Sequence, residues 1–144
     1  MDSRELVGKS ALVTGASSGL GRHFARSLAR HGATVTLAAR RTAALDEACR
    51  EIEALGGKAS AIRMAVTDEK SVAAAFEALP AIDILINNAG VGRPGKAIDL
   101  AAADWDLVAD TNLKGAFLAA QGFARRAIAA GRDGAIVNVA SIAG

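Results

Sequence analysis

Three glycines near the start of the chain form its most chemically suggestive pattern. Gly15, Gly19 and Gly21 lie in the segment VTGASSGLG, residues 13–21. An apolar run precedes the segment and apolar residues at helical spacing follow it, which predicts a strand, a turn and a helix. The free N–H groups and positive dipole end of such a helix suit a phosphate group. The alternative is a glycine turn with only a structural role.

Polar residues recur at three later points in patterns that could support chemistry. The segment Asn87-Asn88-Ala89-Gly90 follows an apolar run, Asn112 interrupts a helical pattern, and Ser141 follows another apolar run. Each also has a structural interpretation: an Asn/Gly turn, a helix kink and a turn serine, respectively. Ser141 is not a hydrolase nucleophile, because it does not stand in a G-x-S-x-G segment and no base-presenting histidine motif follows it.

Apolar runs and helical patterns alternate along the chain and define the elements that position these residues. Five strands are predicted, at residues 11–13, 35–39, 59–66, 82–86 and 135–140. The first helix ends at His31-Gly32, the second is capped by Thr42 and ended by Gly56-Gly57, and the third is capped by Asp68 and ended by Pro80. A longer helical pattern runs from Asp99 to Ala130, with a break expected near Asp110.

The alternation of apolar strands with helices predicts an α/β fold. Its parallel sheet is doubly wound and carries helices on both faces. Ligands of such sheets bind beyond the carboxyl ends of the strands. The glycine segment, Arg40, Asn88 and Ser141 all follow strands, so we expect them to meet at that edge of the sheet.

Length and composition restrict the class of protein. A chain of 144 residues with 51% hydrophobic and 22% charged residues fits one globular domain. The net charge of +2 is too small to indicate a nucleic-acid partner, and no apolar stretch has the length of a membrane span. Cys49, the single cysteine, shares a helical stripe with apolar residues and is expected to be buried. A cytoplasmic location without a metal site is expected.

Arg22, Arg26 and Arg30 recur at helical spacing along the first predicted helix. Basic residues in this arrangement usually form a solvated helix face, and we interpret them in that way.

Four motifs occur in the order found in one enzyme family. They are T-G-x-x-x-G-x-G at residues 14–21, N-N-A-G at 87–90, the segment around Asn112, and N-x-x-S at 138–141. Together they resemble the N-terminal part of classical short-chain dehydrogenases/reductases, and the resemblance covers essentially the whole chain. Within the family, residues such as SGLGRH and AARR look most like the gluconate 5-dehydrogenase and 3-oxoacyl-carrier-protein reductase branches.

The resemblance implies a Rossmann-type NAD(P)-binding domain spanning residues 1–144. It also implies hydride transfer between a nicotinamide cofactor and an alcohol or carbonyl substrate. In the family, the residue matching Asn112 supports a proton relay through water, and the one matching Ser141 hydrogen-bonds the substrate. The implied cofactor-binding residues are Gly15, Ser17, Ser18, Gly19, Leu20, Gly21, Arg40, Arg41, Val66, Asn88, Ala89 and Gly90.

Ala39 and Arg40 bear on the choice of cofactor. An acid after the second strand would bind the ribose hydroxyls of NAD, whereas an arginine accommodates the 2′-phosphate of NADP. The guanidinium fork suits phosphate, so NADP is favoured over NAD, with Arg41 as a second contact. The chain departs from the family at Ala65-Val66, where an acid often meets the adenine, and we expect Val66 to make an apolar contact there.

The family's acid/base is a tyrosine in Y-x-x-x-K, downstream of the serine, and this chain contains no tyrosine. We therefore expect a fold truncated after its fifth strand, with an open apolar edge, and a chain that is inactive alone. The intact parent is expected to be an oxidoreductase and a homo-oligomer, a dimer or a tetramer. The alternative is a non-catalytic NADP-binding or regulatory module.

Overall fold

The fold is a parallel sheet of five strands in the order β3-β2-β1-β4-β5. The computed structural model describes residues 5–142, so the expected domain bounds, residues 1 and 144, lie outside the described residues. The strands are β1 Ser10–Thr14, β2 Thr34–Ala39, β3 Lys58–Arg63, β4 Ile84–Asn87 and β5 Ala135–Asn138. The order steps outward from β1 in both directions, which confirms the doubly wound topology expected from the sequence.

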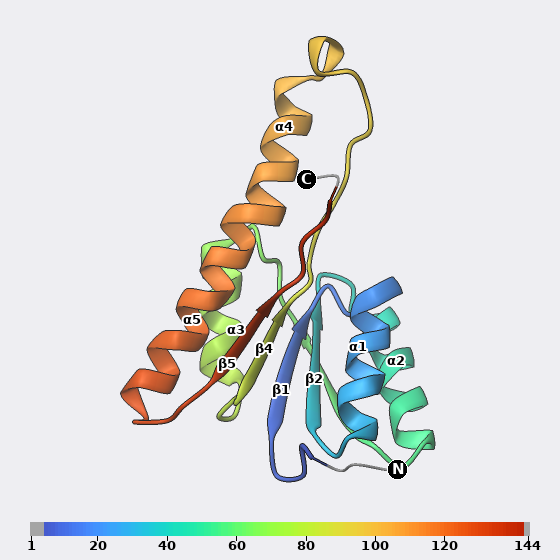
Figure 1. Cartoon of the computed structure of the whole chain (residues 1–144), viewed down its shortest axis with the longest axis vertical. Helices are drawn as coiled ribbons and strands as arrows, with labels where there is room; N and C mark the ends of the chain where they lie inside the picture. Colours follow the sequence, from blue (N-terminus) through green and yellow to red (C-terminus); the bar gives the residue numbers. More distant parts are fainter. Residues whose placement is uncertain (1–4, 143–144) are drawn as a thin grey trace.

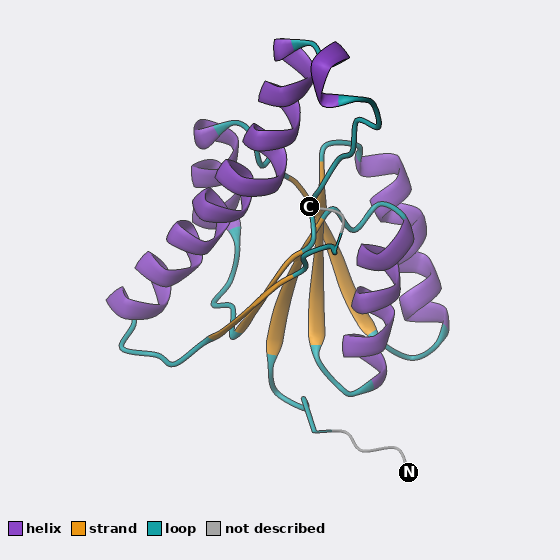
Figure 2. Ribbon diagram, turned by 45° about the horizontal axis from the view of Figure 1, so that its top comes forward, coloured by secondary structure: helices purple, strands orange, loops and turns teal. Residues whose placement is uncertain are grey.

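Helices cover both faces of the sheet (Figure 2). On one face, α1 (Gly19–Arg30) and α2 (Thr42–Ala54) bury a cluster that includes Val13, Leu37 and Ile52. On the other face, α3 (Glu69–Ala78) and α5 (Gly115–Ala129) bury a second cluster. Both faces of the central strands are thus removed from water, as their continuous apolar sequence requires.

The predicted helix ends are mostly confirmed. Gly32 and Gly56 follow α1 and α2 with φ of 97° and 81°, a conformation that favours glycine. Asp68 caps α3, because its side chain accepts a hydrogen bond from the Lys70 N–H at 2.9 Å. The expectation that Thr42 caps α2 is wrong by one residue. Arg41 occupies the cap position with extended backbone, and Thr42 is the first helical residue.

The long helical segment after β4 does not stop near Asp110, where a break is expected, but changes there to a π-helical turn. It consists of a 3₁₀ turn, Ala97–Asp99, then α4 (Ala102–Ala109), a π-helical turn (Asp110–Lys114) and α5. Together, α4, the π-helical turn and α5 form one helical rod that extends beyond the sheet (Figure 1). Within residues 5–142, no helix combines the length and apolarity needed to cross a bilayer.

The third strand ends three residues earlier than predicted. After Arg63 the chain turns, because the Ala65 N–H donates to Ser71 Oγ at 3.0 Å and the Asp68 N–H donates to the Ala65 carbonyl at 3.0 Å. Val66 therefore lies in a loop at the carboxyl end of β3 rather than within the strand.

The fifth strand is also shorter than predicted and lies at the edge of the sheet. Its four residues are exposed, including Ile136 at 40% and Val137 at 49%. The described structure therefore has the open apolar edge expected from the sequence.

Candidate functional site

A cavity of about 380 Å³ opens at the carboxyl edge of the sheet, between the start of α1, the start of α2 and the segment after β4. Its volume falls in the range of small-molecule and cofactor sites, roughly 300–1,000 Å³. Most of the residues proposed from the sequence to bind a cofactor line it. They are Gly15, Ser17, Ser18, Leu20, Arg40, Arg41, Val66, Asn88, Ala89 and Gly90.

The amino end of α1 faces this cavity without a cap of its own. Ser18 is in the cap position with extended backbone, but its side chain makes no capping hydrogen bond, and the first turn contains no acid. At α3, by contrast, the Asp68 cap and Glu69 in the first turn both neutralise the amino end. The unneutralised dipole and free N–H groups of α1 are suited to an anion such as a phosphate.

Gly15 and Gly21 permit close packing of the loop. An added Cβ on Gly15 would lie 2.7 Å from Ala89 Cα, and one on Gly21 would lie 2.4 Å from the Gly15 carbonyl oxygen. Neither Gly21 nor Gly19 lines the cavity. Gly21 therefore packs the start of α1 against the loop.

Gly19 differs from these two glycines. It has φ of 55°, and an added Cβ would meet no described atom within 4 Å. The backbone conformation at position 19 thus favours glycine, and packing against the rest of the protein does not require it.

Thr14 joins the loop to the end of β4. Its Oγ1 accepts hydrogen bonds from the N–H groups of Asn88 and Ala89, both at 3.1 Å. In return, Asn88 Nδ2 donates to the carbonyl oxygens of Thr14 and Gly15 at 3.1 and 3.3 Å. Four hydrogen bonds thus fix the glycine loop relative to the segment after β4, on the floor of the cavity.

Arg40 and Arg41 are exposed where β2 leads into α2, and both side chains line the cavity. Neither forms a hydrogen bond or an ion pair with a described residue, in contrast to Arg22, which binds Glu47 and Glu51. The first turn of α2 likewise contains no acid and no side-chain cap. Two unpaired guanidinium groups and a second open helix start therefore make this end of the cavity suitable for another phosphate.

The rest of the cavity wall comes from residues that were not assigned to cofactor binding from the sequence. They are Ala39, Met64, Thr67, Val91, Leu107 and Thr111. Several of them are apolar, and apolar residues carry no sequence pattern that distinguishes a ligand contact from the core. Thr111 offered one signal, because it precedes Asn112 and a threonine inside a helical pattern is unusual.

Asn112 lies in the π-helical turn and binds the loop after β4. Its Oδ1 accepts from the Val91 N–H at 2.8 Å, and its Nδ2 donates to the Val91 carbonyl at 2.9 Å. It does not line the cavity itself, although a Cβ on Gly90 would lie only 3.4 Å from its Oδ1. The structure therefore places Asn112 beside the site, with its side-chain amide engaged by backbone.

Ser141 is exposed and follows β5 at the same edge of the sheet, outside the lining of the cavity. The Val139 N–H donates to the Asn87 carbonyl at 2.9 Å, and Asn87 Nδ2 donates to Asn138 Oδ1 at 3.0 Å. These bonds direct the segment that carries Ser141 along the carboxyl end of β4.

Other reactive groups lie away from the site. Cys49 is buried as expected, at 8% exposure, and desolvation raises the pKa of its thiol. Among residues 5–142, no group of three or more His, Cys, Asp or Glu residues is arranged to hold a metal ion.

Comparison with known proteins assigns the whole arrangement to one family. The model of the family described as short chain dehydrogenase matches residues 9–144. The gluconate 5-dehydrogenase of Gluconobacter oxydans is 43% identical over 145 residues, which are 98% of this chain and 56% of that protein. A 3-oxoacyl-acyl-carrier-protein reductase of Thermotoga maritima is 37% identical, over 96% of this chain and 58% of that protein.

A solved structure agrees with these relatives. The gluconate 5-dehydrogenase of Burkholderia cenocepacia, crystallised with NADP and tartrate, superposes with a TM-score of 0.90 at 35% identity. The match covers 97% of this chain and 57% of that one. The chain thus spans somewhat more than half the length of the relatives it matches.

Proposed function

This chain belongs to the short chain dehydrogenase family, and on that premise we propose that it forms the cofactor-binding part of an NADP-dependent oxidoreductase. The substrate is an alcohol or a carbonyl compound. When bound, the nicotinamide cofactor supplies or accepts the hydride. The observation that carries the proposal is the cavity lined at one end by the open start of α1 and at the other by Arg40 and Arg41.

The residues of the cavity fit NADP in order along its length. The N–H groups at the start of α1, with Ser17 and Ser18, bind the pyrophosphate. Gly19 lies just outside the cavity lining and leaves open space for it, because no atom beyond its chain neighbours and its own helix lies within 4 Å of its Cβ position. Arg40 and Arg41 bind the 2′-phosphate through charge-assisted hydrogen bonds. Val66, which is 9% exposed, supplies an apolar wall for the adenine.

Toward the nicotinamide end, Asn88, Ala89 and Gly90 border the cofactor, and bonds to Thr14 hold Asn88 and Ala89 in place. We assign Ser141 to hydrogen bonding of the substrate oxygen and Asn112 to positioning of a relay water. The two bonds to Val91 hold Asn112 in place for that role. The solved relative with NADP and tartrate supports NADP as cofactor and hydroxy acids among the first substrates to test.

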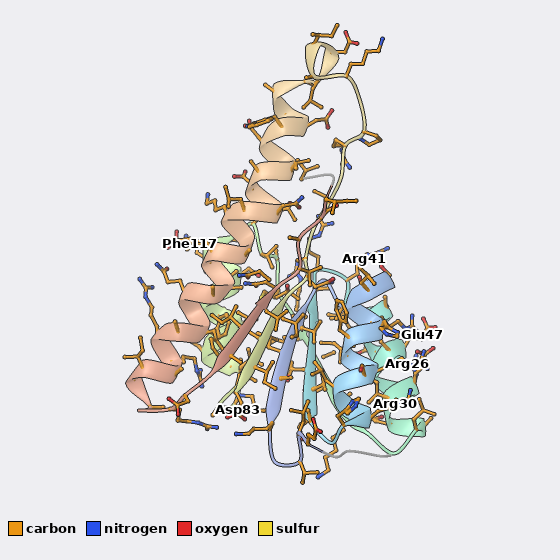
Figure 3. All side chains as sticks on the ribbon, viewed as in Figure 1. Arg26, Arg30, Arg41, Glu47, Asp83 and Phe117 are labelled. Carbon is orange, nitrogen blue, oxygen red and sulfur yellow. The ribbon has the colours of Figure 1, made fainter. Side chains whose placement is uncertain are left out.

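We further propose that the intact protein is a homo-oligomer. Large apolar side chains are exposed along the rod of α4 and α5, including Trp105 at 65% and Phe117 at 58% (Figure 3). Exposed apolar side chains gathered on one element are typical of association surfaces. Light scattering on the wild type and on Phe117→Lys tests this, since a change in mass on substitution is expected.

One observation favours a second candidate, an NADP-binding module without turnover. The 144 residues contain no tyrosine, and hydride transfer requires a positioned proton donor or acceptor with a suitable pKa. No other residue assigned to the site is given that role, because the amide of Asn112 does not titrate and Ser141 is assigned to hydrogen bonding of the substrate oxygen.

Titration with NADPH and NADH, followed by turnover assays on sugar acids, polyols and 3-oxoacyl thioesters, tests both candidates. We expect residues 1–144 to bind NADPH in preference to NADH and to show no turnover. Absence of NADPH binding by the folded chain would refute the cofactor assignment. Turnover by the wild type that is lost in Ser141→Ala would instead rule out the second candidate, a binding module without turnover. It would also require an acid/base other than tyrosine.

A further inference from the structure

A second cavity lies at the opposite edge of the sheet from the cofactor site. Its volume is about 470 Å³, and the ends of α1 and α2 bound it together with the starts of β2 and β3. None of the residues assigned above to cofactor or substrate lines it. Figure 3 shows Arg26 and Arg30 along the lower half of α1, far from Arg41 at the upper end of α2. We call this cavity the lower cleft.

The described lining of the lower cleft contains three cations, Arg26, Arg30 and Lys58, and no acid. None of the three forms an ion pair with a described residue. An excess of positive charge around one cavity attracts anions and raises their local concentration.

The charge excess follows from the sequences of the two helices. The basic stripe of α1 begins with Arg22, which is paired with Glu47 at 3.2 Å and Glu51 at 2.6 Å on α2. The next residue of α2 at the same spacing is Leu55. The acids that face the stripe at this spacing therefore end before the stripe does. The solvated-face interpretation holds for Arg26 and Arg30, which are exposed, but not for Arg22, which is half-buried and paired.

The walls between the cations are apolar. Ala29 and Ile52 are 7% and 1% exposed and form the inner surface, while Leu55 stands at the rim and is 63% exposed. The lower cleft thus combines a cationic region with an apolar surface that water contacts. A ligand that carries both an anionic group and an apolar group would contact the cations and the apolar surface at the same time.

The carboxyl ends of α1 and α2 repel an anion in the lower cleft only weakly. Each carboxyl end carries about half a negative charge, so three full cations exceed both together. The last carbonyl groups are also engaged, since the Ala33 N–H donates to the Leu28 carbonyl at 3.1 Å and the Gly57 N–H to the Ile52 carbonyl at 2.9 Å. The three cations of the lining therefore outweigh the two helix ends.

We propose that the lower cleft is a second binding site, which takes a small phosphate monoester with an apolar organic group. The phosphate lies among Arg26, Arg30 and Lys58, where the planar guanidinium groups donate paired hydrogen bonds to its oxygens. The organic group packs on Leu55, which is 63% exposed. This site is independent of the cofactor cavity and does not rest on the function proposed above.

Phenyl phosphate is the probe, and amide NMR of the 14.6 kDa chain locates where it binds. Gly32, Gly56 and Gly57 line the lower cleft, whereas Gly15 lines the cofactor cavity, so the two sites give separate signals. We expect saturable shifts at the first three glycines, with tighter binding of phenyl phosphate than of inorganic phosphate or benzyl alcohol. Shifts confined to Gly15, or equal affinity for the two phosphates, would refute the proposal.

Two variants and a matched control complete the test. Arg30→Gln combined with Lys58→Gln removes two cations, and Leu55→Glu adds a carboxylate at an exposed rim position where the fold tolerates it. Each should weaken phenyl phosphate binding by about tenfold or more. Arg50→Gln removes a charge from α2 outside the lower cleft and should leave the affinity unchanged. Equal weakening in all three would indicate nonspecific attraction and overturn the assignment.

Discussion

The side-chain amide of Asn112 pairs with both backbone groups of Val91. One bond of 2.8 Å runs from the Val91 N–H to Asn112 Oδ1, and one of 2.9 Å runs from Asn112 Nδ2 to the Val91 carbonyl. Residues 21 apart in sequence thus form a small two-bond ring, which ties the loop after β4 to the π-helical turn. Because Val91 lines the cofactor cavity and Asn112 does not, Asn112 shapes that wall through its partner.

The first prediction concerns this ring. Asn112→Ala removes both hydrogen bonds and should lower the free energy of unfolding by about 1 kcal/mol, since the bonds are exposed. NADPH should bind several-fold more weakly because Val91 is released. Urea unfolding and NADPH titration measure the two effects. Leu113→Ala, in the same turn at a 74% exposed position, is the control and should change neither; equal loss in both variants would contradict the role of the ring.

The second prediction concerns the choice of cofactor. Arg40→Ala combined with Ala39→Asp removes a phosphate contact and supplies an acceptor for ribose hydroxyls, so the preference for NADP should reverse. Loss of one charge-assisted contact should weaken NADP binding by roughly 1.5–3 kcal/mol. Calorimetric titration with both cofactors measures the ratio of affinities. An unchanged ratio of the affinities for NADP and NAD would show that Arg40 does not contact the cofactor.

The third prediction concerns Gly19. Gly19→Val should abolish NADPH binding while the chain still folds, because the new side chain meets open space where the pyrophosphate is placed. The left-handed φ of 55° adds strain of about 1 kcal/mol or somewhat more.

Gly131 provides a matched control for that strain. It has φ of 61° and also has no described atom near its Cβ position, but it lies in the turn between α5 and β5. Gly131→Val should therefore reduce stability by a similar amount and leave NADPH affinity intact. If both variants bound NADPH normally, the pyrophosphate would not bind next to Gly19.

The fourth prediction concerns acid stability. Hydrogen bonds from the Ser10 N–H and hydroxyl, with Arg132 at 2.5 Å, lower the pKa of Asp83 below its ordinary value of 3.8. A depressed folded-state pKa means that Asp83 stabilises the fold above the unfolded pKa, and that this stability is lost as the pH falls through the folded value.

Asp83→Asn should therefore cost about 1–3 kcal/mol at pH 7 and flatten the loss of stability below about pH 4. Thermal unfolding between pH 2.5 and pH 7 measures the profile. Asp133→Asn, an exposed carboxylate in the nearby turn, is the control. A profile of Asp83→Asn that parallels the wild type would show that another group dominates the acid transition.

The sequence predicts the central part of the fold well because each feature there depends on local patterns. Apolar runs locate all five strands, and Gly32, Gly56 and Asp68 mark helix ends through their own backbone preferences or side-chain bonds. The end of β3 was misplaced because Ser71, six residues beyond Ala65, turns the chain away from an apolar run that reads as strand. Apolarity alone does not separate a buried strand residue from a buried loop residue such as Val66.

Among the apolar residues of the cavity wall, the sequence indicates only those that the family motifs carry or adjoin, Leu20, Val66 and Ala89. The roles of Met64 and Leu107 in the cavity wall depend on which elements the fold brings together, and their residue types do not indicate it. The basic stripe of α1 shows the same limit. Its spacing is visible in the sequence, but the pairing of Arg22 with Glu47 and Glu51 depends on the neighbouring helix.

The bonds of Thr14 to Asn88 and Ala89 have a consequence for how the chain acquires its binding site. They join residues 74 and 75 positions apart, so the glycine loop reaches its final form only after β1 has paired with β4. Such distant pairings form slowly, because closing a long loop costs conformational entropy. During synthesis, the loop therefore stays unfinished until more than half of the chain has left the ribosome. A nascent chain that binds NADPH at this loop has therefore already paired β1 with β4.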